Sequence, residues 1–126
     1  MVRFSPKAAP LDYSKCNQTV TLYRATFSPE FKCERKVIKD RAFLDFKRTE
    51  NVDKTGNKGA SSFLLVIKGE VDIKPQDKVF YGIGKEITTR EEWADFVPPK
   101  QTGLVVVEYV DPKFWNGKVC HMEAGG

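Results

Sequence analysis

Hydrophobic and polar residues alternate along much of this chain with the period of two that is typical of β-strands. The longest apolar run is Phe63–Ile67, whose composition predicts a strand with little exposure on either face. A second strand is predicted from Lys78 to Ile83, after a turn at Lys74–Asp77 in which Pro75 fixes φ. We therefore expect a central hairpin between residues 59 and 84, to which the other strands are added.

Four further segments have the alternation or the β-branched composition of strands. They are Thr19–Thr26, Lys32–Phe46, Gly103–Val110 and Gly117–Ala124. The second of these is best explained as one long, bent strand, because its apolar residues do not gather at helical spacing. Turns are expected at Ser28–Glu30 and Asp111-Pro112. Phe114–Gly117 is expected to form a hairpin tip, where Asn-Gly favours positive φ.

One short helix is predicted, because Thr89 stands three residues before Glu92 as in a capping box, and the helix should end before Pro98. Trp93 and Phe96 are three residues apart and would face one way. We favour their packing on the sheet over contact with a partner. Since the crossover helices of a parallel sheet are missing, the fold class is all-β, a small antiparallel β-barrel with long loops.

Two segments look least like core. Residues 1–18 are predicted to form an extended N-terminal arm. A neighbouring subunit could hold its apolar side chains, which are Phe4, Leu11 and Tyr13. A mobile terminus is the alternative. Residues 19–126 are predicted to form a single domain with a long loop at 47–62. Loops of this length are usually functional or disordered. Its four cations form the candidate contact surface. They are Lys47, Arg48, Lys54 and Lys58.

Charge is concentrated in one part of the 126-residue chain, whose formal net charge is +4. Residues 32–58 hold nine basic and five acidic residues, an excess equal to that of the whole chain. Clustered cations suit phosphate binding, although a mixed-sign run is more often a solvated face. No apolar stretch approaches the ~20 residues of a membrane-spanning helix, and the start lacks a secretory apolar region, so we expect a soluble, intracellularly made protein without membrane contact.

Candidate catalytic and metal-binding residues are few. The three cysteines are widely spaced, and the single histidine, His121, follows Cys120 in a predicted strand, so the two side chains should point to opposite faces. A zinc site would need closer ligands, and GIGK at Gly82–Lys85 is too short for a phosphate loop. We expect reduced thiols, no metal, no cofactor and no catalysis.

The order of motifs resembles the head-completion or "stopper" proteins of the tailed-bacteriophage head-tail connector. The resemblance lies over residues 19–126, in VTLY at Val20–Tyr23, GNKGASSFLLVI at Gly56–Ile67, IKPQDKVFYG at Ile73–Gly82 and the ending VVEYVDPKFWNGKVCHMEAGG. In such proteins a polar Gly-containing loop precedes an apolar strand, a turn leads into Asp-x-Val-x-x-Gly, and the last strand carries His before an aromatic residue. Here Met122 follows His121.

The resemblance implies a virion protein made in the host cytoplasm: a β-barrel repeated in a six- or twelve-fold homo-oligomeric ring below the portal and adaptor. The family's long loop points into the channel, helps to close it and retains packaged double-stranded DNA without reading its sequence. Here that loop matches Lys47–Ser61. The arm and residues 87–101 would contact neighbouring subunits or adjoining rings, which include the portal or adaptor and a tail terminator or tail tube protein.

Aromatic residues at a hairpin tip are natural partner anchors, so Phe114 and Trp115 join Trp93 as contact candidates; folding back onto the barrel is the alternative. A competing function is a small OB-like nucleic-acid-binding barrel, in which Phe43, Phe46 and Tyr81 would stack on bases. An enzyme dependent on His121 is the third class.

Overall fold

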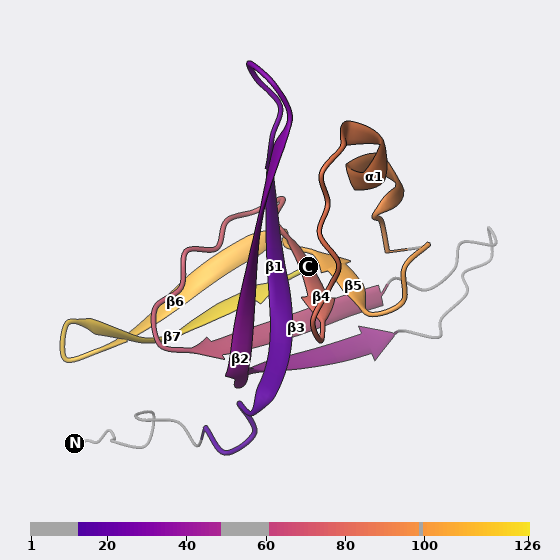
Figure 1. The fold of residues 1–126 in the computed structure, drawn as a ribbon. Helices are drawn as coiled ribbons and strands as arrows, with labels where there is room; N and C mark the ends of the chain where they lie inside the picture. Colours follow the sequence, from indigo (N-terminus) through magenta and orange to yellow (C-terminus); the bar gives the residue numbers. More distant parts are fainter. Residues whose placement is uncertain (1–12, 49–60, 99) are drawn as a thin grey trace, which may run out of the picture.

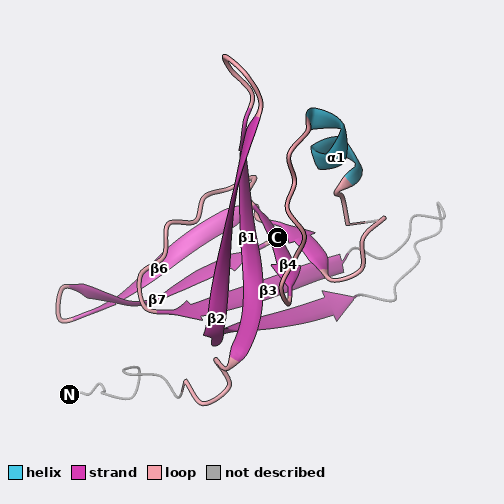
Figure 2. Cartoon of the chain, in the orientation of Figure 1, coloured by secondary structure: helices cyan, strands magenta, loops and turns pink. Residues whose placement is uncertain are grey.

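The structure is a computed structural model that describes residues 13–48, 61–98 and 100–126. In these residues one sheet and one short helix account for the regular structure (Figures 1 and 2). The elements are β1 (Gln18–Thr26), β2 (Lys32–Arg48), β3 (Ser61–Lys68), β4 (Lys78–Tyr81), α1 (Arg90–Asp95), β5 (Leu104–Val106), β6 (Tyr109–Trp115) and β7 (Lys118–Gly125).

All strand pairs are antiparallel, in the order β5-β4-β1-β2-β3-β7-β6. The predicted all-β antiparallel fold with one short helix is therefore confirmed. The end strands β5 and β6 do not pair with each other, so the sheet is open there and closure into a barrel stays a prediction. Only residues 107 and 108 separate these strands in the chain, and Val107 N donates to Asp77 O while Glu108 N donates to Gly125 O. The chain thus passes directly from one end of the sheet to the other.

The expected long, bent strand is confirmed as β2. Its first part pairs with β1 as far as Ala42 opposite Gln18, and its second part pairs with β3 from Ala42 onward. Between them Asp40 has φ of 60°, a left-handed conformation that Asp tolerates better than most residues, and its N–H reaches Thr19 Oγ1 at 3.3 Å. The bend lets one strand serve two partners.

Three expectations about pairing and turns are wrong. The central hairpin does not form, because β3 lies between β2 and β7 while β4 lies between β1 and β5. Asp111-Pro112 continues β6, and Pro is tolerated because β6 is an edge strand. The strands also extend into the predicted 47–62 loop, since Lys47 and Arg48 pair with Ser62 and Ser61. The β2–β3 connection is therefore residues 49–60.

Two apolar clusters lie on opposite faces of the sheet, because Leu22 belongs to one and Tyr23 to the other. The larger contains residues of every strand from β1 to β5 and of β7, with Val110 of β6 packed against it. The smaller lies beside α1 and contains Phe96, with Trp93 packed against it. The predicted packing of these two aromatic residues on their own sheet is confirmed, because this cluster also contains Tyr23 of β1 and Leu104 of β5.

The predicted capping box is present. Thr89 Oγ1 accepts from Glu92 N at 3.0 Å, and Glu92 Oε1 accepts from Thr89 N at 3.0 Å. Glu92 Oε1 also accepts from the Thr88 amide and hydroxyl, and these bonds lower the pKa of the Glu92 carboxyl. The start of α1 is thus fixed by its own sequence.

The segment between β4 and α1 is held by side chains of β1. Thr21 Oγ1 donates to Gly82 O at 2.7 Å and accepts from Gly84 N at 2.9 Å, and Tyr23 OH donates to Lys85 O at 2.7 Å. A Cβ on Gly84 would lie 2.0 Å from Tyr23 OH, so only glycine allows this approach. These bonds fix the path of the chain toward α1.

Candidate interaction surfaces

The β6–β7 hairpin projects beyond the sheet as a two-stranded ribbon. Pairing of β3 with β7 ends at Lys68 opposite His121, whereas β6 and β7 remain paired to Trp115 opposite Lys118. Asn116 and Gly117 close the hairpin with φ of 54° and 77°, which confirms the predicted Asn-Gly tip. Figure 1 shows the ribbon extending to one side of the sheet.

The two aromatic residues of this ribbon face solvent, with Phe114 65% and Trp115 45% exposed. Trp115 is paired with Lys118 across the turn and Phe114 with Val119, so the two aromatic side chains lie on opposite faces. Lys118 is exposed and has no ion-pair partner among the described residues. One face therefore combines an indole with a free ammonium. Of the contact candidates in the described part of the chain, Phe114 and Trp115 are the exposed ones.

The β1–β2 hairpin forms a second projecting ribbon. Pairing of β1 with β4 ends at Tyr23, whereas β1 and β2 remain paired to Thr26 opposite Lys32. A groove of about 480 Å³ lies between this ribbon and the residues before α1. Its lining includes Cys33 and Ile87, and burial raises the pKa of the Cys33 thiol. Sequence patterning gave no signal for this groove, because it depends on how residues 87 and 88 lie against a distant hairpin.

Tyr13 contacts its own chain. Its hydroxyl lies 2.8 Å from Nδ1 of His121, which is 2% exposed, and Nε2 of that ring lies 2.9 Å from Glu123 Oε2. The tautomer with its proton on Nε2 satisfies both bonds, with Tyr13 donating to Nδ1 and the ring donating to Glu123. Burial raises the pKa of the Tyr13 hydroxyl. The network attaches the start of the described chain to the outside of β7.

Trp93 also contacts its own chain. The Nζ atom of Lys78, a residue only 7% exposed, lies 4.0 Å from the Trp93 ring centroid. The same Nζ donates to Trp93 O at 2.9 Å and Phe96 O at 2.5 Å, so β4 supplies the cation that the last turn of α1 lacks. Sequence reasoning missed this contact, because Lys78 looks like the solvent-facing residue of an alternating strand.

Two of the four residues of the predicted cation surface lie outside the described ranges. Lys47 and Arg48 form the end of β2, while Lys54, Lys58, Phe4 and Leu11 are not in the described ranges. The β2–β3 connection leaves from the end of β3 that begins at Ser61. The β6–β7 ribbon extends past the other end of β3, at Lys68. The strand ends at Arg48 and Ser61, to which the connection is attached, are therefore at the opposite end of the sheet from the aromatic ribbon.

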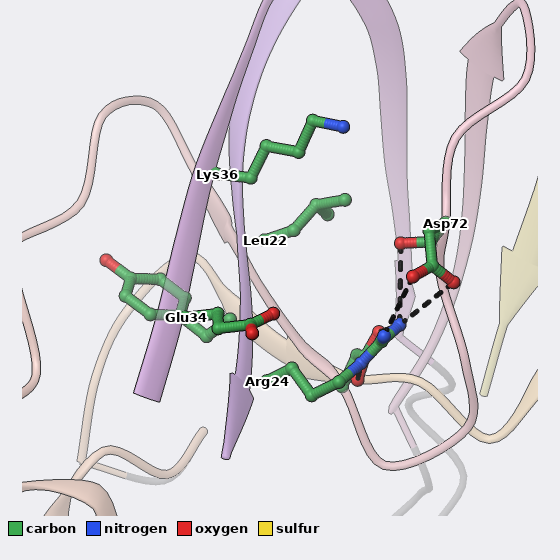
Figure 3. A pocket seen from close by; sticks show the side chains of 7 residues that line it. Leu22, Arg24, Glu34, Lys36 and Asp72 are labelled. Atoms are coloured by element: carbon green, nitrogen blue, oxygen red, sulfur yellow. Dashed lines mark hydrogen bonds and ion pairs between the residues drawn. The ribbon is translucent and has the colours of Figure 1, made fainter. Parts of the chain in front are cut away.

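A small polar pocket lies between β1, β2 and residues 72–77 (Figure 3). Arg24 binds Asp77 through Nε at 2.9 Å and Nη2 at 2.8 Å, and it binds Asp72 through Nη1 at 3.0 Å. These bonds lower the pKa of the Asp72 carboxyl and raise the pKa of the guanidinium. Asp77 Oδ2 also accepts from Lys74 N at 2.9 Å. The charges of Arg24, Asp72 and Asp77 satisfy one another, and their bonds fix the 74–77 turn.

Residues 13–48, 61–98 and 100–126 also bear on metal binding, membrane crossing and the environment of His121. No group of three potential metal ligands occurs there. No helix in this part of the chain has the length and apolar character needed to cross a membrane. His121 is enclosed by its two hydrogen-bond partners. The described surface is instead marked by projecting ribbons with exposed aromatic residues, which are typical of protein contacts.

Comparison with known proteins gives no relative: no protein-family model, curated protein or solved structure matches this chain.

Proposed function

We propose that this protein is a structural component of the head-tail connector of a tailed bacteriophage. Copies form a ring below the portal or adaptor, close the channel on packaged double-stranded DNA and provide a surface for the tail. The motifs quoted above, from VTLY to the C-terminal hairpin, motivate the assignment. In this proposal the protein acts by assembly and carries out no reaction.

The observation that carries the proposal is that the strand ends to which the β2–β3 connection is attached and the β6–β7 ribbon lie at opposite ends of the sheet. The β2–β3 connection, with Lys54 and Lys58, leaves one end, and the ribbon with Trp115 projects beyond the other. A ring protein needs such a separation, because one part must reach the axis while another contacts protein. Repetition around a ring also multiplies a modest charge into a strong field along the channel.

Deletion of residues 51–57 tests the channel role. We expect the shortened protein to fold and to enter virions, while filled heads lose DNA during purification. Lys54→Gln with Lys58→Gln should give a partial loss, because phosphate attraction falls with each cation removed. Asn51→Ala with Asn57→Ala alters the same connection without changing charge and serves as the matched control. Full DNA retention by the deletion variant would contradict the proposal.

The second candidate is an OB-like nucleic-acid-binding protein. It is favoured by two aromatic side chains that are about half exposed, Phe46 at 50% and Tyr81 at 49%. Such side chains stack on unpaired bases. Fluorescence anisotropy with a labelled oligonucleotide separates the candidates: a single-strand binder should reach micromolar affinity and lose it in Phe46→Ala, whereas a ring component should bind free DNA poorly.

A further inference from the structure

We propose that copies of this chain associate head to tail, with the tip of the β6–β7 ribbon of one copy in the groove beside the β1–β2 ribbon of the next. We call Trp115–Lys118 the ribbon tip and the 480 Å³ groove at Thr26, Cys33 and Ile87 the ribbon groove. The inference rests on the proposed ring-forming function, to which it adds the residues of the subunit contact.

The ribbon tip has the composition of an interface anchor. Trp115 is the large apolar group of the tip, and tryptophan is among the residues most enriched in interface hot spots. Its indole lies on the same face as the ammonium of Lys118, which forms no ion pair with the residues that the structure describes. The Asn116-Gly117 turn between them is tight, so the two groups are presented together at the end of a narrow ribbon.

The ribbon groove complements this tip in size and charge. Its volume of about 480 Å³ falls within the ~300–1,000 Å³ range of binding pockets and accommodates one aromatic side chain. Cys33, Ile87 and Pro29 supply apolar lining, and Glu30 supplies a carboxylate at the groove. Glu30 has no ion-pair partner among the described residues, so its carboxylate is available to Lys118. The Glu34 side chain also lines the polar pocket beside Arg24 and is not assigned to Lys118 (Figure 3).

The groove walls are positioned independently of a partner. Ile87 is buried in the cluster beneath α1, and the chain before it is bonded to β1 through Thr21 and Tyr23. The opposite wall is the paired β1–β2 ribbon, where Thr26 pairs with Lys32. Little ordering entropy is then lost when the groove is filled.

The balanced charge of the β6–β7 ribbon favours a protein as its partner over a nucleic acid or an anionic membrane. On the β6–β7 ribbon Asp111 and Glu123 equal Lys113 and Lys118 in number, and Lys113 is paired with Asp111 at 2.8 Å. Such a surface lacks the excess of cations that nucleic acid or an anionic membrane requires.

Tip and groove belong to separate hairpins, β6–β7 and β1–β2, which project from the sheet in different directions (Figure 1). A contact between them is heterologous, since each copy uses its tip on one neighbour and its groove on the other. Repetition of such a contact closes into a ring when the rotation allows it, and otherwise extends as a filament. A tip and a groove on every subunit therefore suffice to build a ring.

Sedimentation velocity of the purified protein, without DNA or other virion proteins, tests the contact. We expect self-association to be detected at protein concentrations of about 1 mM or below. Trp115→Ala should raise the dissociation constant of this self-association at least about 30-fold. Phe114→Ala removes a more exposed aromatic side chain from the other face of the same ribbon. It should change the dissociation constant of self-association less than about 3-fold. A wild-type monomer throughout this range, or equal effects of the two substitutions, would overturn the inference.

A mixing experiment tests the head-to-tail geometry. Thr26→Arg fills the groove at an exposed position, and by itself should be monomeric, as should Trp115→Ala. Mixed in equal amounts, the intact tip of the first variant should bind the intact groove of the second and give heterodimers but no larger species. A mixture that stays monomeric refutes the pairing. Because no DNA is present, this result is independent of the DNA-retention test.

Discussion

Replacing Lys78 with methionine tests how α1 is held to the sheet. Methionine has nearly the same length but no donor, so the change removes two hydrogen bonds from Nζ, to Trp93 O and Phe96 O, and the cation over the Trp93 ring. The Trp93 carbonyl retains a bond from Phe96 N at 3.2 Å. The Phe96 carbonyl has no other donor among the described residues, and it would be left unsatisfied in a buried position.

Opposing contributions set the size of the effect. A hydrogen bond from a charged donor contributes about 1.5–3 kcal/mol, and a desolvated cation–π contact about 1–2 kcal/mol. Burial of the ammonium acts in the other direction and lowers the pKa of Lys78, a cost that methionine avoids. We therefore expect Lys78→Met to lower the free energy of unfolding by about 2–4 kcal/mol, which lowers Tm by roughly 10 °C in a domain of this size.

Urea denaturation of Lys78→Met and of Lys74→Met gives the comparison, since Lys74 is an exposed lysine four residues away. The control should lie within ~0.5 kcal/mol of wild type. In a Trp115→Phe background Trp93 is the only tryptophan, so its fluorescence reports α1 directly. Equal stability of the wild type and Lys78→Met, with unchanged Trp93 emission, would refute our account of how α1 is held.

The pH dependence has a defined sign. Folding lowers the pKa of Lys78 below the ordinary lysine pKa of about 10.4. At a pH between these two pKa values the unfolded chain therefore holds more protons than the folded chain. Stability of the wild type should therefore rise with pH in this window relative to Lys78→Met. Burial raises the pKa of Tyr13 and Tyr23, which has the opposite effect above pH 10, but both proteins share these groups and the difference cancels them.

Two further substitutions test the other buried polar contacts. Arg24→Met breaks the ion pairs that fix the 74–77 turn and should lower the free energy of unfolding by about 2 kcal/mol. Lys36→Met in the same pocket is the control and should have little effect on this free energy. Equal losses of stability in the two variants would contradict the role of the Arg24 guanidinium. Tyr13→Phe leaves Nδ1 of buried His121 without its donor and should cost about 1–2 kcal/mol, with faster hydrogen exchange in the adjoining N-terminal turn. Tyr81→Phe is its control, and identical exchange in both variants would argue against an attachment through Tyr13.

Local features of the fold were predictable because they depend on neighbouring residues. Alternation and apolar composition located most of the strands, the Thr89–Glu92 box located α1, and Asn116-Gly117 located the hairpin tip. Each of these signals acts within a few residues. Sequence reasoning therefore identified the exposed aromatic ribbon, although not the groove that we propose for its partner. The prediction of one strand over Gly103–Val110 is wrong, because the segment is divided between β5 and β6 at residues 107 and 108.

Strand pairing was not predictable in the same way. Phe63–Ile67 looks like half of a hairpin with the next strand along the chain, yet its partners are β2 and β7. Such pairings are decided by the register of residues far apart in sequence, and here by the bend at Asp40 that gives β2 two partners. The same long-range geometry buries Lys78 and brings His121 to Tyr13, contacts that no local pattern encodes.

The two projecting ribbons are the feature of the described fold from which we propose assembly. A two-stranded ribbon is only marginally stable without further packing, and both hairpins extend beyond the strands that flank them. The β6–β7 ribbon in addition exposes Phe114 and Trp115. Insertion of Trp115 into a neighbour would bury apolar surface that is otherwise exposed, while the connection with Lys54 and Lys58 leaves from the other end of the sheet. If both proposals hold, substitutions at these two places affect different properties: Trp115→Ala impairs ring formation, and neutralising the two lysines leaves the ring intact while DNA escapes.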